Sequence, residues 1–164
     1  MTVKISYLKN KNSKISGNLV LFSNEKFSIN HLKKYISNTE FTYVNDLLKN
    51  SDLKKNMFVY ELNAKKKIVL VSIKNISKTS DLENLGAEFY GRVNYGKNSE
   101  YFINSDSVLS KHDNFIGHFL HGLKLKSYEF NKYKTKKEKR LISINVLGNK
   151  NITSAKNQLK FKAL

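Results

Sequence analysis

The sequence predicts a three-layer α/β domain in which a mixed β-sheet is flanked by helices. Short apolar runs typical of strands alternate with longer amphipathic segments typical of helices, and two of the runs lie close enough to form a hairpin. No segment of about 20–50 residues repeats, which argues against a solenoid. Strands that alternate with helices become parallel neighbours, whereas the hairpin adds an antiparallel pair and makes the sheet mixed.

Six segments have the patterns of strands. Residues 3–7 alternate apolar and polar side chains, which is typical of a half-buried edge strand. The uninterrupted run Leu19–Phe22 favours a strand covered on both faces. The hairpin is predicted over Met57–Leu62 and Ile68–Ile73, and the remaining strands over Tyr101–Ile103 and Leu141–Leu147.

Five segments have apolar residues at the spacing of helices. A helix capped by Ser28 or Asn30 is predicted to carry Leu32, Tyr35 and Ile36, and the next to carry Tyr43, Val44, Leu47 and Leu48. Ser80 and Glu83 have the spacing of a capping box, in which each side chain accepts a backbone N–H. The helix that follows has a single apolar stripe of Leu82, Leu85, Phe89 and Val93.

The longest predicted helix is capped by Asp106. Its apolar stripe consists of Val108, Leu109, His112, Phe115, Ile116, Phe119, Leu120 and Leu123. A final helical segment, Ile152 to Leu164, follows the last strand and stops without a C-terminal cap, which suggests an element cut short. We therefore divide the chain into one domain over residues 1–150 and a truncated helix over residues 151–164.

Composition excludes several classes of protein. A chain of 164 residues and 19.0 kDa can bury a stable core without metals or disulfides, and 40% apolar residues argue against disorder. The absence of cysteine excludes disulfides, thiolate metal sites and cysteine nucleophiles. No apolar run approaches membrane-spanning length, and the first residues lack the apolar core of a secretory signal. We expect a soluble cytoplasmic protein with no membrane partner.

The net charge of +17 invites a nucleic-acid interpretation. However, 28 of the 30 basic residues are lysine, since Arg92 and Arg140 are the two arginines, and asparagine occurs 21 times. An AT-rich genome favours lysine and asparagine without selection for DNA binding. Proteins that read sequence usually rely on the bidentate arginine fork, which lysine cannot imitate. We attribute the charge mainly to composition.

Two apparent motifs have simpler explanations. Gly91 to Lys97 has the spacing of a phosphate-binding loop, but Asn98 replaces the required Ser or Thr. The predicted helix also comes before this segment, whereas in that motif the helix follows the loop. A helix end capped by Gly96 is the better interpretation. His112, His118 and His121 suggest a metal site, yet they lack HExxH spacing. We place His112 on the apolar stripe and expect the other two to face solvent. No pattern predicts catalytic or metal-binding residues.

The segment from Lys124 to Arg140 has the densest positive charge. It holds eight basic residues against two acidic ones, interleaved with Tyr128, Phe130 and Tyr133. Such a mixture can bind single-stranded nucleic acid by stacking and phosphate contacts. Alternatively, the aromatic side chains anchor a loop to the core while the lysines face water. The candidate anion or nucleic-acid contacts are Lys132, Lys134, Lys136, Lys137 and Arg140.

The same segment resembles a known family. Gly122, followed by Ser127 to Lys137, resembles the G…Y-x-F-[DN]-x-Y-[KR]-[ST]-K signature near the end of the N-terminal domain of leucyl (cytosol) aminopeptidases. The predicted hairpin, the helix that contains Gly86 and the long helix after it follow the order of elements in that domain. Ser72 and Lys74 depart from the pattern, because the family often has glycine in this strand.

The resemblance implies a macro-like N-terminal domain without catalytic residues. In that family a separate C-terminal domain binds two divalent metals, commonly manganese or zinc, and releases N-terminal amino acids, and the enzyme is a hexamer. Its N-T-D-A-E-G-R stretch and lysine-bearing metal motif do not occur in these residues. We therefore carry over no catalytic or metal site, and expect no cofactor bound by this chain, a C-terminal peptidase domain as partner, and homo-oligomers. The alternatives are nucleic-acid binding, which some bacterial relatives show, and ADP-ribose binding, for which the glycine-rich phosphate loop is missing.

Overall fold

The computed structural model describes residues 2–8, 17–73, 76, 78–93, 99–109, 114–132 and 141–148, with the backbone alone at residues 2 and 129–132. These residues form a mixed six-stranded sheet in the order β1-β6-β5-β2-β4-β3, together with three α-helices. All neighbouring strands are parallel except β3, which is antiparallel to β4. The predicted α/β fold with a mixed sheet is confirmed.

Each predicted strand is present. The strands are β1 (Thr2–Tyr7), β2 (Asn18–Ser23), β3 (Met57–Glu61), β4 (Lys67–Ser72), β5 (Ser99–Asn104) and β6 (Leu141–Leu147). β1 lies at one edge of the sheet and β2 is covered on both faces, as the sequence indicates. β3 and β4 form the hairpin, with Met57 opposite Val71 and Glu61 opposite Lys67.

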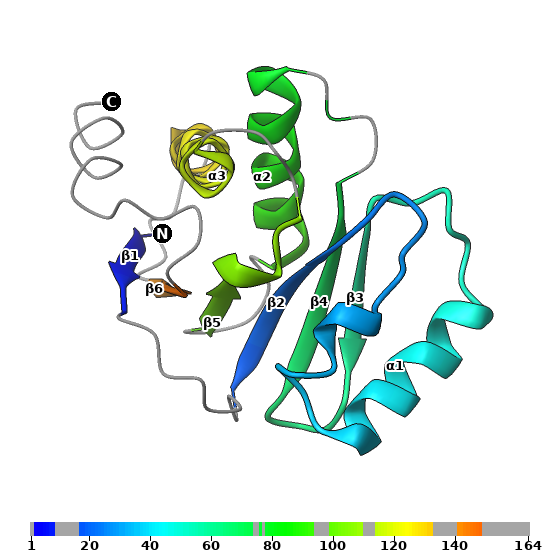
Figure 1. Cartoon of the computed structure of the whole chain (residues 1–164). Helices are drawn as coiled ribbons and strands as arrows, with labels where there is room; N and C mark the ends of the chain where they lie inside the picture. Colours follow the sequence, from blue (N-terminus) through cyan, green and yellow to red (C-terminus); the bar gives the residue numbers. More distant parts are fainter. Residues whose placement is uncertain are drawn as a thin grey trace.

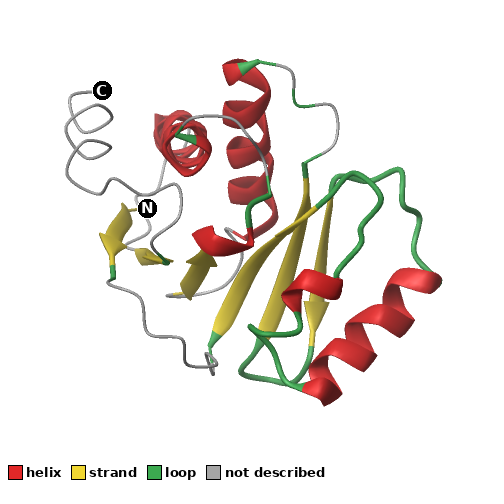
Figure 2. Cartoon of the chain, in the orientation of Figure 1, coloured by secondary structure: helices red, strands yellow, loops and turns green. Residues whose placement is uncertain are grey.

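Helices cover the two faces of the sheet unequally. α2 (Thr79–Val93) and α3 (Phe115–Lys132) lie side by side on one face, and α1 (Asn38–Lys49) lies on the other (Figure 1). α1 stands over the end of the sheet formed by β2, β4 and β3, as the colouring by secondary structure also shows (Figure 2). The molecule therefore has three layers and a separate apolar core on each side of the sheet.

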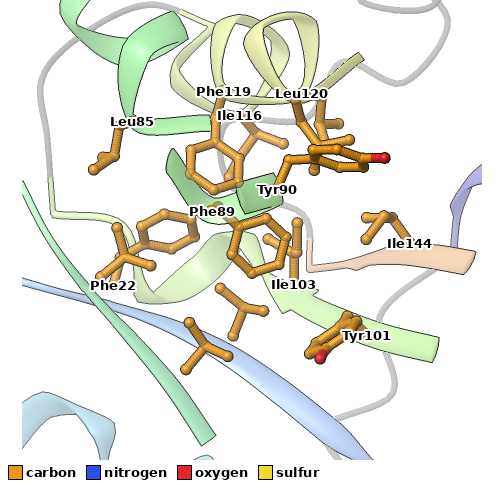
Figure 3. Close-up of a cluster of buried hydrophobic side chains, with 14 of the residues drawn as sticks. Phe22, Leu85, Phe89, Tyr90, Tyr101, Ile103, Ile116, Phe119, Leu120 and Ile144 are labelled. Carbon is orange, nitrogen blue, oxygen red and sulfur yellow. The ribbon is translucent and has the colours of Figure 1, made fainter. Parts of the chain in front are cut away.

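The larger core lies between the sheet and the pair α2 and α3. Side chains of both helices, among them Phe89 and Phe119, point toward Phe22 and Ile103 on the sheet (Figure 3). The ring of Phe22 meets those of Phe115 and Phe119 edge to face, with centroids 5.3 and 5.4 Å apart. All of the stripe predicted for α2 is buried.

Two glycines allow α2 and α3 to approach closely. A Cβ at Gly86 would overlap the carbonyl oxygen of Phe119, and a Cβ at Gly122 would overlap that of Glu83. A side chain at either position would therefore push the helix backbones apart. This reciprocal contact accounts for both glycines, since each lacks the Cβ that would keep the two backbones apart.

The first predicted helix is shorter than expected. Only the 3₁₀ turn η1 (Asn30–Leu32) forms there, and its N-cap is Ile29, without a side-chain cap, so capping by Ser28 or Asn30 is wrong. Leu32 and Ile36 are nevertheless buried in the smaller core. Phe27, three residues before this turn, adopts a positive φ of 55°, which lies outside the helical region.

The capping boxes also differ from the prediction. α2 begins at Thr79, so Ser80 lies inside it, and the Asp81 carboxylate accepts the backbone N–H of Lys78 at 3.1 Å. Glu83 turns away from this helix end and contacts α3. A capping box does exist at α1, where the Ser37 hydroxyl accepts the N–H of Glu40 and the Glu40 carboxylate accepts that of Ser37.

The longest helix begins later than predicted. Asp106 belongs to a second 3₁₀ turn, η2 (Ser105–Ser107), and Val108 is extended, with φ −72° and ψ 121°. α3 then begins at Phe115 and continues to Lys132. The apolar stripe is confirmed from Phe115 to Leu123, whereas Leu109 is exposed and His112 lies outside the described residues. Val108 is buried, so its apolar character reflects a core contact from extended backbone.

Two further predictions fall on segments that are not described: the Gly96 cap and the final helix from Ile152 to Leu164. Among the described helices, none combines the length and the apolar character needed to cross a membrane.

Candidate functional site

The candidate basic segment begins inside α3. Its first part, Lys124 to Lys132, is helical, and Tyr128 is one of the most exposed large side chains, at 57%. Tyr128 therefore does not anchor this part to the core; Ser127 is buried instead, and its hydroxyl donates to the carbonyl of Lys124 at 2.6 Å. Lys132 is the last residue of α3, while Lys134, Lys136, Lys137 and Arg140 lie outside the described residues.

Positive charge is distributed unevenly along the chain. The described ranges contain fifteen of the thirty basic residues and eleven of the thirteen acidic ones. The remaining segments contain fifteen basic residues and two acidic ones within 45 residues. The described fold is thus close to charge balance, and most of the +17 belongs to the segments outside it.

The histidines of α3 take part in helix packing. His121 Nδ1 lies 2.9 Å from Glu83 Oε1 of α2, and the His121 side chain is only 15% exposed. His118 is also part-buried, so the expectation that both face solvent is wrong. No group of three or more potential metal ligands occurs in the described part of the chain.

The sheet has a topological switch point between β2 and β5. After β2 the chain passes through α1 to β3 at one end of the sheet, whereas after β5 it passes through α3, on the opposite face, to β6 toward the other end. In open α/β sheets, ligands usually bind in the crevice at the carboxyl ends of two such strands. Any pocket for a nucleotide-like ligand is therefore expected beside Ser23 and Asn104.

The turn η2 closes that position. β2 and β5 pair only from Asn18 to Val20, and beyond this point Ser107 takes the place of the missing strand partner. The hydroxyl of Ser107 accepts the N–H of Phe22 at 3.0 Å and donates to the carbonyl of Asn104 at 2.7 Å.

Neighbouring serines hold the same edge together. The hydroxyl of Ser105 donates to the carbonyl of Leu147 at 2.6 Å, and that of Ser72 donates to the carbonyl of Asn24 at 3.0 Å. These serines are buried, and their hydroxyls donate to backbone carbonyls. Sequence reasoning missed them; for Ser105 and Ser107 the signal was the polar S-D-S stretch that directly follows a strand.

The pKa values of three tyrosines are raised, but these residues do not form a catalytic centre. Burial raises the pKa values of Tyr7 and Tyr101, and it raises that of Tyr60 against the opposing effect of a hydrogen bond from Ser51. These tyrosines belong to three different strands, β1, β5 and β3. Active sites usually bring perturbed groups together in one cleft. The three shifts therefore reflect core packing.

Known proteins share the fold at low sequence identity. No protein-family model and no curated protein sequence matches the chain. A mutant of tomato leucine aminopeptidase superimposes with a TM-score of 0.65 over 98% of this chain, at 16% identity. The chain spans 35% of the length of that enzyme.

Two further structures match. The macrodomain of Thermus aquaticus DarG covers 90% of this chain and all of its own, with a TM-score of 0.51 and 10% identity. A cytosol aminopeptidase from Coxiella burnetii covers 85% of this chain and 28% of its own at 15% identity, but its TM-score of 0.49 is too low to compare folds. The α/β fold of this chain is thus one found in a macrodomain and in part of a leucine aminopeptidase.

Proposed function

We propose that this chain is the non-catalytic N-terminal domain of a cytoplasmic, leucyl-aminopeptidase-like metalloenzyme. The observation that carries the proposal is the superposition on tomato leucine aminopeptidase over nearly the whole chain, together with the tyrosine-rich signature from Ser127 to Lys137. The parent enzyme would release N-terminal amino acids, and this domain would contribute to assembly and to control of access.

The side chains described at the switch point support the proposal of a non-catalytic domain. The described residues bring together no metal ligands, and the serines at the switch point are hydrogen-bonded to backbone. The proposal assigns the two divalent ions, manganese or zinc, to a C-terminal peptidase domain, and within the described residues no cluster of ligands competes with that assignment. A hexameric parent is part of the same proposal.

Closure of the switch point also argues against ADP-ribose binding by this macro-like fold. A bound phosphate group needs cations, or backbone N–H groups that are free to donate to it. Here the N–H of Phe22 is already taken by Ser107, and no glycine-rich loop follows β2.

Hydrolysis by the isolated chain tests the proposal. The chain should not release amino acid from an amino-acyl amide, even with added manganese, whereas a longer protein that includes the proposed peptidase domain should do so. The reading frame beyond Leu164 provides an independent check, because it should continue into an N-T-D-A-E-G-R stretch. Metal-dependent turnover by the purified chain, or a reading frame without that stretch, would reject the proposal.

Nucleic-acid binding is the alternative, and the uneven distribution of charge favours it. If the segment Lys124–Arg140 is a dedicated site, neutralising Lys132, Lys134, Lys136 and Lys137 should remove most of the affinity for a short duplex. Removal of each phosphate contact should lower the log–log salt dependence of binding by about 0.9.

A matched quartet serves as control: Lys33, Lys34, Lys54 and Lys55, all exposed on the described surface. If both quartets weaken binding equally at two salt concentrations, the positive charge acts diffusely and the dedicated site is rejected.

A further inference from the structure

Among the described residues, no helix covers one face of the sheet at its β1 end. α1 covers β2, β4 and β3, but no described helix lies on the same face of β5, β6 and β1 (Figures 1 and 2). Parallel strands are normally covered on both faces. Three parallel strands with one open face therefore suggest that a partner covers them.

Side-chain alternation identifies the residues of this open face. Val3, Ile5 and Tyr7 of β1 and the isoleucines of β6 pack against the large core. Their neighbours along each strand must point the opposite way. The open face consists of Lys4, Ser6 and Leu8, of Leu141, Ser143 and Asn145, and of Glu100 and Phe102.

The open face combines apolar and charged side chains. Leu8 and Leu141 are 43% and 38% exposed, although they extend from strands whose core-facing residues are largely covered. Phe102 is only partly buried against the smaller core. Lys4 and Glu100 are both exposed, at opposite sides of the face. This mixture is typical of a surface that can bind a partner.

The strand register aligns the two charges. Lys4 is paired with Ser143, and Ser143 with Glu100, so the three form one row across β1, β6 and β5. The next row contains Ser6, Asn145 and Phe102. Each row therefore has a small or amide side chain at its centre, on β6, and the first row has opposite charges at its two ends.

We propose that the open face binds a second copy of this chain across a two-fold axis that runs along β6. Such an axis places Lys4 of each copy opposite Glu100 of the other, because both belong to the same row. Leu141 then meets Leu141 of the second copy, and the short Ser143 side chains allow the sheets to reach the usual separation of about 10 Å. The charge row is thus complementary to itself, as a two-fold interface requires.

The size of the face limits the strength of this dimer. Three strands of six residues cover about 14 by 20 Å, which is well below the roughly 800 Å² per partner of a standard interface. The proposed association is therefore weak and reversible, and the net charge of +17 opposes it at low salt. The inference concerns the sheet face alone and does not depend on the proposed peptidase parent.

Charge exchange tests the proposed geometry. Sedimentation equilibrium of the full 164-residue chain, in about 0.3 M salt and up to about 1 mM protein, should detect monomer and dimer. Lys4→Glu and Glu100→Lys should each weaken association at least about tenfold, because each places like charges opposite one another. The double variant should restore association to within about threefold of the original chain.

Matched variants away from the face control for net charge. Lys54→Glu and Glu61→Lys make the same charge changes at exposed positions on the other half of the molecule and should leave association within about twofold. Because Glu100 accepts a hydrogen bond from Asn145 at 3.0 Å, thermal melts should confirm that each variant remains folded. A chain that stays monomeric at 1 mM, or a double variant that does not recover, would overturn the proposal.

Discussion

The two sides of the sheet are packed by different means. On one side, α2 and α3 meet at two glycines, and the rings of Phe115 and Phe119, both on α3, pack against Phe22. On the other side, α1 buries only Val44 and Leu48 and is joined to the hairpin by an ion pair between Glu40 and Lys66. The first side depends on close helix–helix packing, whereas the second combines a smaller apolar core with an ion pair. The two sides should therefore respond differently to the same kind of substitution.

The largest difference is expected from deletion of core side chains. Phe119 is fully buried, with the rings of Phe22 and Phe89 5.4 and 5.5 Å away, so Phe119→Ala should lower the free energy of unfolding by about 3–5 kcal/mol. Leu48→Ala on α1 should cost only about 2 kcal/mol, since that site lies close to solvent and can relax. Urea denaturation measures both.

A surface variant serves as the control for this comparison. Lys124→Ala, outside the buried stripe of α3, should change stability by less than about 0.5 kcal/mol. If Leu48→Ala costs as much as Phe119→Ala, the two sides of the sheet are equally rigid and the comparison fails.

Glycine substitutions should distinguish close packing from helix propensity. Gly122→Ala should destabilise by about 1–3 kcal/mol, because the added Cβ overlaps the backbone of Glu83. Gly91, also within the α2 and α3 layer, has open space around its Cβ position, so Gly91→Ala should stabilise by up to about 1 kcal/mol. Opposite signs in thermal melts would support the close approach, and a gain in both variants would exclude it.

The ion pair on the α1 side should contribute less. Lys66 Nζ lies 2.9 Å from Glu40 Oε1, with side chains 9% and 24% exposed, so the pair is intermediate between buried and surface cases. Glu40→Ala should cost about 1–2 kcal/mol, and a double-mutant cycle with Lys66→Met should recover part of it. Lys67→Met, whose pair with Glu61 at 3.9 Å is exposed, serves as the control and should be almost neutral.

The strands could be predicted from sequence because each carries a local pattern. Apolar runs such as Leu19–Phe22 indicate strands directly, and the hairpin follows from the short interval between its strands. The start of α3 could not be predicted in this way. Val108 continues the helical spacing but contacts the core from extended backbone, because η2 first closes the gap between β2 and β5. That gap is a property of the whole sheet.

The candidate site was less predictable than the fold. The serines at the switch point become significant only when β2, β5 and β6 are brought together, and none belongs to a known motif. The open sheet face likewise depends on the strand order, which places β1 beside β6. By contrast, the lysines predicted as contacts lie mostly outside the described residues, so their role stays a prediction.

The smallest effect concerns the helix caps, and it tests where sequence and structure disagree. The sequence favours Ser80 as the cap of α2, whereas the structure begins α2 at Thr79 and has its capping box at α1, where the Ser37 hydroxyl accepts the N–H of Glu40 at 3.1 Å. Ser37→Ala removes that acceptor and should cost about 1 kcal/mol. Ser80→Ala replaces serine within the first turn of α2 by a better helix former and should change stability by no more than about 0.5 kcal/mol. Both variants can be compared by urea denaturation of the same chain. A larger loss at Ser80 than at Ser37 would mean that α2 begins two residues later, at Asp81, with Glu83 turned back to its own helix end and away from His121.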